Sequence, residues 1–322
     1  MKPPVDYIFP PAAVGEVPYW RLVLRGCSQL CFQSNELTGL FFLAAVFIAS
    51  PISAAYLLVA GAIAPAGRML FGEPKNIVAS GLPCLNPGLT ALALPAFFQT
   101  GWTNAGMWGV LIVSVVVTVL VVSLLLMVLP FPILTLPFLI VFWALFALAP
   151  HFDVLQPIAS DHAHVTAFHP FIAVLHSLGQ ALFVTSIWSG TLFLAGVTLS
   201  NWRHGLIALI GAVIGTLVSY YYRDVDAESV NLGLYGFNGV VTAVAVFVFC
   251  GGQLRLAILG ALIATILTPA IAGVGVQTLS APLVLTTWLM LALGWLGDHW
   301  FDIKPAPEMR GPPAPAQKQP GE

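Results

Sequence analysis

Two pairs of matching stretches in this 322-residue sequence decide how the chain folds. SQLCFQSNELTGLFFLAAV (28–46) aligns with GQALFVTSIWSGTLFLAGV (179–197) at an offset of 151 residues. Further along, GLPCLNPGLTALA (81–93) aligns with GLYGFNGVVTAVA (233–245) at an offset of 152 residues. The nearly constant register indicates an internal duplication. The matched pairs include Gln29 and Gln180, Phe32 and Phe183, and Asn86 and Asn238.

The composition places both copies in a lipid bilayer. Hydrophobic residues make up 59% of the chain and charged residues only 7%, whereas a soluble domain carries about 25% charged residues. The net charge of -2 leaves no basic surface for nucleic acid. We therefore expect an integral membrane protein whose partners are the lipid bilayer, further copies of the chain, or a small solute.

Near-continuous apolar runs recur between about residues 37 and 300, and a spanning helix needs about 20 apolar residues. Two shorter apolar stretches, 26–36 and 171–182, precede runs at matching places and predict re-entrant half-helices. Five spans per half require the halves to have opposite orientations, so we predict an all-α fold of two inverted five-helix repeats with a pore at their interface. The ten predicted spans are 37–51, 52–67, 77–99, 106–128, 132–149, 184–200, 205–222, 231–250, 254–270 and 282–299.

The basic residues orient the chain. With the N-terminus inside, ten of the eleven Lys and Arg residues fall on the cytoplasmic side, and only Arg223 falls outside. We expect a multi-pass protein of the inner or plasma membrane with both termini cytoplasmic. Its predicted parts are a cytoplasmic or interfacial N-terminal segment (1–25), a first repeat (26–149), an extracytoplasmic linker (150–170), a second repeat (171–300) and a disordered cytoplasmic tail (301–322).

The predicted spans contain almost no ionisable side chain, which favours a neutral solute because each intramembrane charge costs at least about 2.5–3.5 kcal/mol. A neutral polar solute in a narrow pore needs acceptors that replace water and flat apolar walls. The duplicated pair of Gln and Phe, three residues apart and so on one helix face, offers both. The alternative is that each Gln bonds a neighbouring helix while each Phe packs in the core.

Two further features lie where helices are expected to break. Asn86 and Asn238 stand among Gly and Pro residues, and they either line the pore or satisfy backbone groups that the break leaves without partners. In LPFPILTLPF (129–138), three prolines remove backbone donors, so freed carbonyls and the Thr135 hydroxyl are predicted to form a column of acceptors. Ser280 occupies the matching place in the second half.

Other classes of function find less support. An ion-coupled secondary transporter of a small polar solute is the alternative that we keep, and it would need an acidic or cation-binding group near the midplane. An intramembrane enzyme would need a facing nucleophile and base, whereas His176 and Ser177 are adjacent on a predicted helix. His162 and His164 could hold a metal ion, but a solvated loop is the expected interpretation. We predict no metal site, no cofactor and no catalytic residue.

The segment FPILTLPF (131–138) resembles the Leu-Pro-x-x-Thr-x-Pro-Phe signature of the urea transporter family, with Phe131 at the leading Leu. The segments that begin at Gln29 and at Gly233 look like two more of its recurrent motifs, so the resemblance covers about residues 20–300. It implies a homotrimer in which each protomer encloses its own pore. It also implies passive, channel-like flow of urea, or a closely related small neutral amide, down its gradient.

The resemblance further assigns roles along the pore. Opposite Phe237, Leu85 replaces the aromatic residue of the family pattern, and a pore that lacks one ring could admit a slightly different amide. The ladder of acceptors would be Gln29, Gln180, Thr135 and Ser280, and the slot walls would be Phe32, Phe183, Leu89, Val241 and Phe237.

Overall fold

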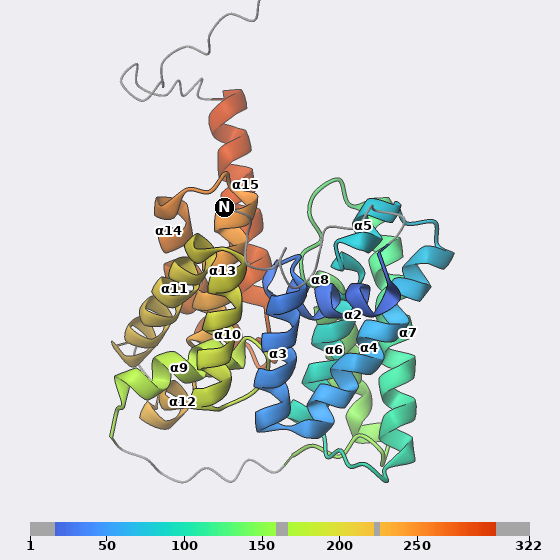
Figure 1. The fold of residues 1–322 in the computed structure, drawn as a ribbon. Coiled ribbons are helices and arrows are strands. Elements are labelled where there is room, and N and C mark those ends of the chain that lie inside the picture. The colour runs from blue at the N-terminus through green and yellow to red at the C-terminus, as the bar shows by residue number, and fades with distance from the viewer. Residues whose placement is uncertain (1–16, 159–166, 222–225, 301–322) are drawn as a thin grey trace, which may run out of the picture.

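A computed structural model describes residues 17–158, 167–221 and 226–300, with side chains as far as residue 296. The regular elements in these ranges are helices, and one isolated β-bridge joins Phe98 to Pro157. Helices from the first half of the chain gather on one side of the molecule and those from the second half on the other, with α3 and α10 packed together between them (Figure 1). The predicted tail (301–322), Arg223 and the pair His162 and His164 lie outside the described residues.

The second half repeats the order of the main helices of the first, and three pairs of helices have equal lengths. Helices α3 and α10 each have 14 residues, α4 and α11 each have 20, and α6 and α13 each have 13. The first half contains α2 (Tyr19–Ser28), η1 (Gln29–Cys31), α3 (Glu36–Ala49), α4 (Pro51–Leu70), α5 (Lys75–Ala79), η2 (Leu82–Cys84), α6 (Leu85–Phe97), α7 (Ala105–Val128), α8 (Leu136–Leu148) and η3 (Ala149–His151). The second contains α9 (Pro170–Gln180), α10 (Ile187–Ser200), α11 (Trp202–Tyr221), α12 (Ala227–Asn231), α13 (Phe237–Phe249), α14 (Leu254–Ala272) and α15 (Ala281–Trp300).

Four described helices, α4, α7, α11 and α14, are long and apolar enough to cross a membrane by themselves. A fifth crossing is formed if the segment Tyr19–Cys31 and α3, which meet at 73°, count as one broken span. The remaining apolar helices have 10–17 residues, with α15 counted over Ala281–Leu296, the part whose side chains are described. The prediction of an all-helical membrane protein is therefore confirmed for the described residues. The ten crossings stay a prediction, and breaks interrupt several of the predicted continuous spans.

The predicted span 77–99 shows how a glycine breaks a span into shorter helices. Gly81 has a left-handed backbone (φ 82°) and divides this stretch into α5, η2 and α6. A Cβ at this position would lie 2.4 Å from the backbone carbon of Arg25, so only glycine allows the close approach. Gly233 (φ 75°) divides α12 from α13 in the same way.

The first short segment also begins earlier than predicted. The helix starts at Tyr19, after Pro18, and not near residue 26. Residues 19–25 did not count as an apolar run because they include Arg21 and Arg25. In the structure, the charges of both arginines are paired with Glu36. The second segment, predicted at 171–182, is α9 at Pro170–Gln180.

The two halves contact each other through bonds that occur twice with the partners exchanged. At the centre, Phe42 stacks on its repeat partner Phe193 with ring centroids 4.9 Å apart. Two sets of hydrogen bonds join the halves, and in each set the two halves exchange the roles of donor and acceptor. They are Thr38 Oγ1 to Gly196 O (2.8 Å) with Ser189 Oγ to Ala45 O (2.7 Å), and Trp143 Nε1 to Gln277 O (2.8 Å) with Trp288 Nε1 to Pro132 O (2.9 Å).

Candidate functional site

A narrow cavity of about 20 Å³ lies between the two halves, with room for roughly one water molecule. We call it the central cavity. No Asp, Glu, Lys, Arg or His is among the described residues that line it. Eight of the nine predicted site residues do line it: Phe32, Leu89, Thr135, Gln180, Phe183, Phe237, Val241 and Ser280. The sequence analysis did not single out the other four, Leu30, Phe138, Ala181 and Leu283, although Phe138 ends the proline-rich motif.

A pair of hydroxyl groups belongs to this cavity. Thr135 Oγ1 lies 2.8 Å from Ser280 Oγ, and both residues are more than nine-tenths buried. Each hydroxyl has one proton and two acceptor lone pairs, so the mutual hydrogen bond leaves acceptor capacity on the pair. The structure thus brings together the two hydroxyl residues that the repeat had matched.

An unusual backbone conformation presents these hydroxyls. Leu134 (φ 49°) and Leu279 (φ 45°) precede them in the left-handed region, which costs an L-residue roughly 1–2 kcal/mol. Asn86 Nδ2 donates to Leu134 O (2.9 Å), and Asn238 Nδ2 donates to Leu279 O (3.1 Å). Of the two interpretations of these asparagines, the contacts support the backbone-satisfying one, and neither asparagine lines the central cavity.

The predicted column of free carbonyl acceptors is wrong for two of its carbonyls, because side chains donate hydrogen bonds to them. Leu134 O accepts from Asn86, and Pro132 O accepts from Trp288 Nε1. Side-chain donors therefore occupy two carbonyls of this non-helical segment. The Thr135 hydroxyl remains as the acceptor that this segment presents to the cavity.

Phe32 and Phe183 line the cavity, but not by the geometry that was predicted. Both have left-handed backbones (φ 55° and 58°) beyond the ends of their helices. The expected shared helix face with Gln29 and Gln180 is therefore wrong, because the chain turns between each Gln and its Phe. Each ring meets a matching aromatic edge, Phe32 at Phe249 (centroids 5.6 Å apart) and Phe183 at Phe97 (6.3 Å).

The two glutamines are anchored by equivalent bonds. Gln29 Nε2 donates to Ser80 O (2.8 Å), and Gln180 Nε2 donates to Leu232 O (3.3 Å) and to Thr185 Oγ1 (2.6 Å). A carbonyl oxygen only accepts, so these bonds fix the amide nitrogen and leave Oε1 as the acceptor. Gln180 lines the central cavity, whereas Gln29 is buried beside it and is not among the lining residues.

The two ends of the central cavity differ in their aromatic content. Phe183 packs against Phe97 and Phe138, and these rings continue into a cluster with Phe98, Phe142 and Phe146. In the repeat, the places of Phe98, Phe138, Phe142 and Phe146 are taken by Cys250, Leu283, Thr287 and Leu291.

A second cavity of about 180 Å³ borders Phe32, and we call it the vestibule. Its lining includes Leu85, Ile133 and Val122, together with the ion pair of Arg68 and Glu73. Nothing in the sequence predicted this ion pair beside Phe32. The Phe32 end of the central cavity therefore adjoins open space, whereas the Phe183 end adjoins packed rings.

Fold and site together define an all-helical membrane protein whose two matching halves enclose a narrow, uncharged cavity of phenyl rings and hydroxyl groups. Residues 20–294 match the family described as urea transporter. The chain is 24% identical to Urea transporter 1 of Ovis aries over 294 residues, which cover 84% of this chain and 76% of that relative. It is also 24% identical to Urea transporter 1 of Rattus norvegicus over 239 residues, which cover 70% of this chain and 62% of that relative. The chain belongs to the urea transporter family.

Proposed function

We propose that the chain is a passive, channel-like path for urea, or a closely related small neutral amide, down its concentration gradient. Urea is flat and uncharged and carries four N–H donors. The observation that carries the proposal is the central cavity, where the Thr135 and Ser280 hydroxyls and the Gln180 amide share one lining with the rings of Phe32 and Phe183. The acceptors replace the water that urea sheds, and the rings press on its faces and exclude ions.

The passage as proposed needs no ion and no covalent step. Coupling to a proton or to sodium would need a titratable or cation-binding group along the path. The described lining of the central cavity has no such side chain, and Arg68 and Glu73, which line the vestibule, pair with each other. We therefore propose that passage of the solute is not coupled to an ion.

We further propose that the two halves are inverted repeats related by a pseudo-twofold axis in the membrane plane. The exchanged bonds support this, since a twofold axis turns each contact into its partner, and the stack of Phe42 on Phe193 would lie on the axis. In this arrangement the shorter helices complete ten crossings, and α2 with η1, and α9, are the re-entrant segments. The halves then open a mouth on each side of the membrane.

Orientation and assembly complete the proposal. The distribution of basic residues supports cytoplasmic termini and a place in the inner or plasma membrane. Membership of the family supports a homotrimer in which each protomer has its own pore.

The test of the substrate is uptake by proteoliposomes that contain the purified protein. We expect urea to equilibrate much faster than in protein-free liposomes, with formamide and acetamide as comparison amides and mannitol as an excluded solute. Uptake of another amide without uptake of urea would overturn the proposed substrate. Uptake of mannitol at the rate of urea would overturn the proposed narrow path.

A further inference from the structure

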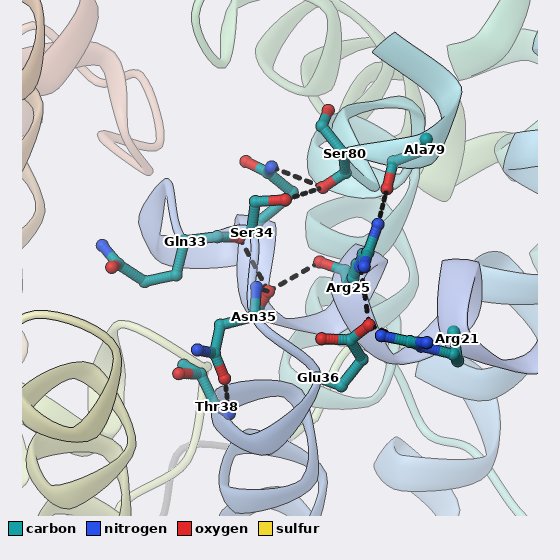
Figure 2. Close-up of polar contacts among 11 residues, drawn as sticks. Arg21, Arg25, Gln33, Ser34, Asn35, Glu36, Thr38, Ala79 and Ser80 are labelled. Carbon is teal, nitrogen blue, oxygen red and sulfur yellow. Dashed lines mark hydrogen bonds and ion pairs between the residues drawn. The ribbon is translucent and has the colours of Figure 1, made fainter. Parts of the chain in front are cut away.

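The turn from Gln29 to Asn35 carries two predicted pore residues and is closed by buried ion pairs. Arg21 Nε and Arg25 Nε both donate to Glu36 Oε1 at 2.8 Å, so α2 before the turn is tied to the first residue of α3 after it (Figure 2). Glu36 is only 3% exposed. A buried charge is costly unless it is paired and hydrogen-bonded, and this chain places few charges inside the bilayer. We call Arg21, Arg25 and Glu36 the clasp.

The clasp reaches the carbonyl groups that anchor Gln29. Arg25 Nη1 donates to Ala79 O (2.7 Å) at the end of α5 (Figure 2). The next carbonyl, Ser80 O, accepts from Gln29 Nε2 (2.8 Å) and from Ser34 Oγ (2.9 Å). Arg25 thus bonds to the residue next to Ser80, whose carbonyl fixes the Gln29 amide.

The second half has an equivalent hydrogen bond to the matching carbonyl but has no acidic or arginine residue at the three matched positions. At the positions of Arg21, Arg25 and Glu36 it has Ile172, His176 and Ile187. His176 Nδ1 lies 2.8 Å from Asn231 O, the carbonyl that matches Ala79 O, and it must donate because a carbonyl only accepts. The common element is therefore the bond to this carbonyl, and the charge is particular to the first half.

The two turns also differ at one matched position, Ser28 in the first and Gly179 in the second. Gly179 packs so tightly in the second turn that a Cβ would lie 2.7 Å from Val184 O. Ser28 stands at the matching place in the first turn, where its Oγ donates to Gln33 O (2.7 Å). The first turn therefore adds a side-chain bond to a backbone bond that both turns have, Gln33 N to Ser28 O (3.2 Å) in the first and Val184 N to Gly179 O (3.3 Å) in the second. Left-handed backbone at a residue such as Phe32 is strained and persists only where its surroundings hold it.

We propose that Arg25 and Glu36 are positioning residues for solute passage, which hold Phe32 and Gln29 in place at one end of the path. This rests on the proposed function, since it assigns a task to the residues of that path. Glu36→Gln keeps the shape of the side chain and removes the charge that both arginines share. We expect Glu36→Gln to lower urea flux about tenfold. This factor corresponds to the conformational entropy of one long side chain that is no longer held in place. We also expect weaker discrimination against 1,3-dimethylurea, because a mobile Phe32 no longer narrows the path.

Two further variants complete the test, one a control for loss of charge and one that copies residues of the second half. Asp153→Asn removes an exposed acid and is the control for loss of charge, with flux like that of the unmodified protein. The triple variant Arg21→Ile, Arg25→His and Glu36→Ile installs the second-half residues and is expected to restore flux and selectivity to within about twofold, because His can donate to Ala79 O. Unchanged flux and selectivity in Glu36→Gln would overturn the proposal, as would a triple variant that folds normally but conducts no better than Glu36→Gln. Absence of urea flux in the unmodified protein would instead overturn the proposed function.

Discussion

Replacing Thr135 by Val removes one hydroxyl of the pair in the central cavity and tests the acceptor role directly. The change keeps the branched shape and leaves the partner hydroxyl of Ser280, 8% exposed, without its 2.8 Å hydrogen bond. A buried polar group that loses its partner costs about 1–3 kcal/mol of stability. A lost hydrogen bond to urea costs about 0.5–1.5 kcal/mol, which corresponds to roughly a twofold to tenfold lower flux.

The double variant Thr135→Val and Ser280→Ala separates stability from passage. The second change removes the hydroxyl that the first had left without its partner, so the double variant should be more stable than Thr135→Val alone. It also removes a second acceptor, so its urea flux should be lower than that of the single variant. Stability and flux therefore move in opposite directions between the two variants.

Two measurements check this. Thermal unfolding of the purified protein reports stability, and the shrinking and reswelling of proteoliposomes in a urea gradient reports flux. Thr191→Val is the matched control, since Thr191 lies on α10 with an exposed side chain and bonds only within its helix among the described contacts. Flux of the double variant equal to that of the control would refute the acceptor role of the hydroxyl pair.

Two further predictions follow from the vestibule and from the packing of the repeats. Leu85→Phe restores a ring beside Phe32 and should lower the flux of N-methylurea several-fold more than that of urea, and equal losses for both solutes would refute the selectivity argument. Gly39→Ala and Gly190→Ala each place a Cβ 1.9 Å from a carbonyl oxygen of the preceding helix and should each lower stability by more than about 1 kcal/mol. Thermal unfolding measures this loss, and a normal melting temperature in either variant would contradict the repeat packing.

The duplication is the part of the fold that the sequence predicts best. The offset of 151 read from Gln29 and Gln180 reappears in the bounds of α3 and α10 and of α4 and α11, because equal residues at equal spacing form equal local structure. The later pairs, such as Trp143 and Trp288, lie at an offset of 145. The helix breaks were harder to predict. Gly81 gives a local signal, whereas the shortening of the other helices depends on packing between the halves, which a count of apolar residues does not contain.

The site shows the same division. Repeat matching singled out the glutamines, the phenylalanines Phe32 and Phe183 and the hydroxyl pair, and the family resemblance added Leu89, Phe237 and Val241. Eight of these nine residues line one cavity. The shared helix face of Gln29 and Phe32 was wrong because a left-handed phenylalanine has no signature in the sequence. The early start of α2 was missed because Arg21 and Arg25 indicated a polar boundary in the sequence. Only the structure shows that Glu36 pairs with both charges.

Urea flux into proteoliposomes under imposed gradients tests the central claim of passive passage most directly. The uncharged lining of the central cavity predicts that flux follows the urea gradient alone and reverses with it. Changing the membrane potential, or imposing a proton or sodium gradient, should leave the rate unchanged. Accumulation of urea against its own gradient when a proton or sodium gradient is applied would contradict the account.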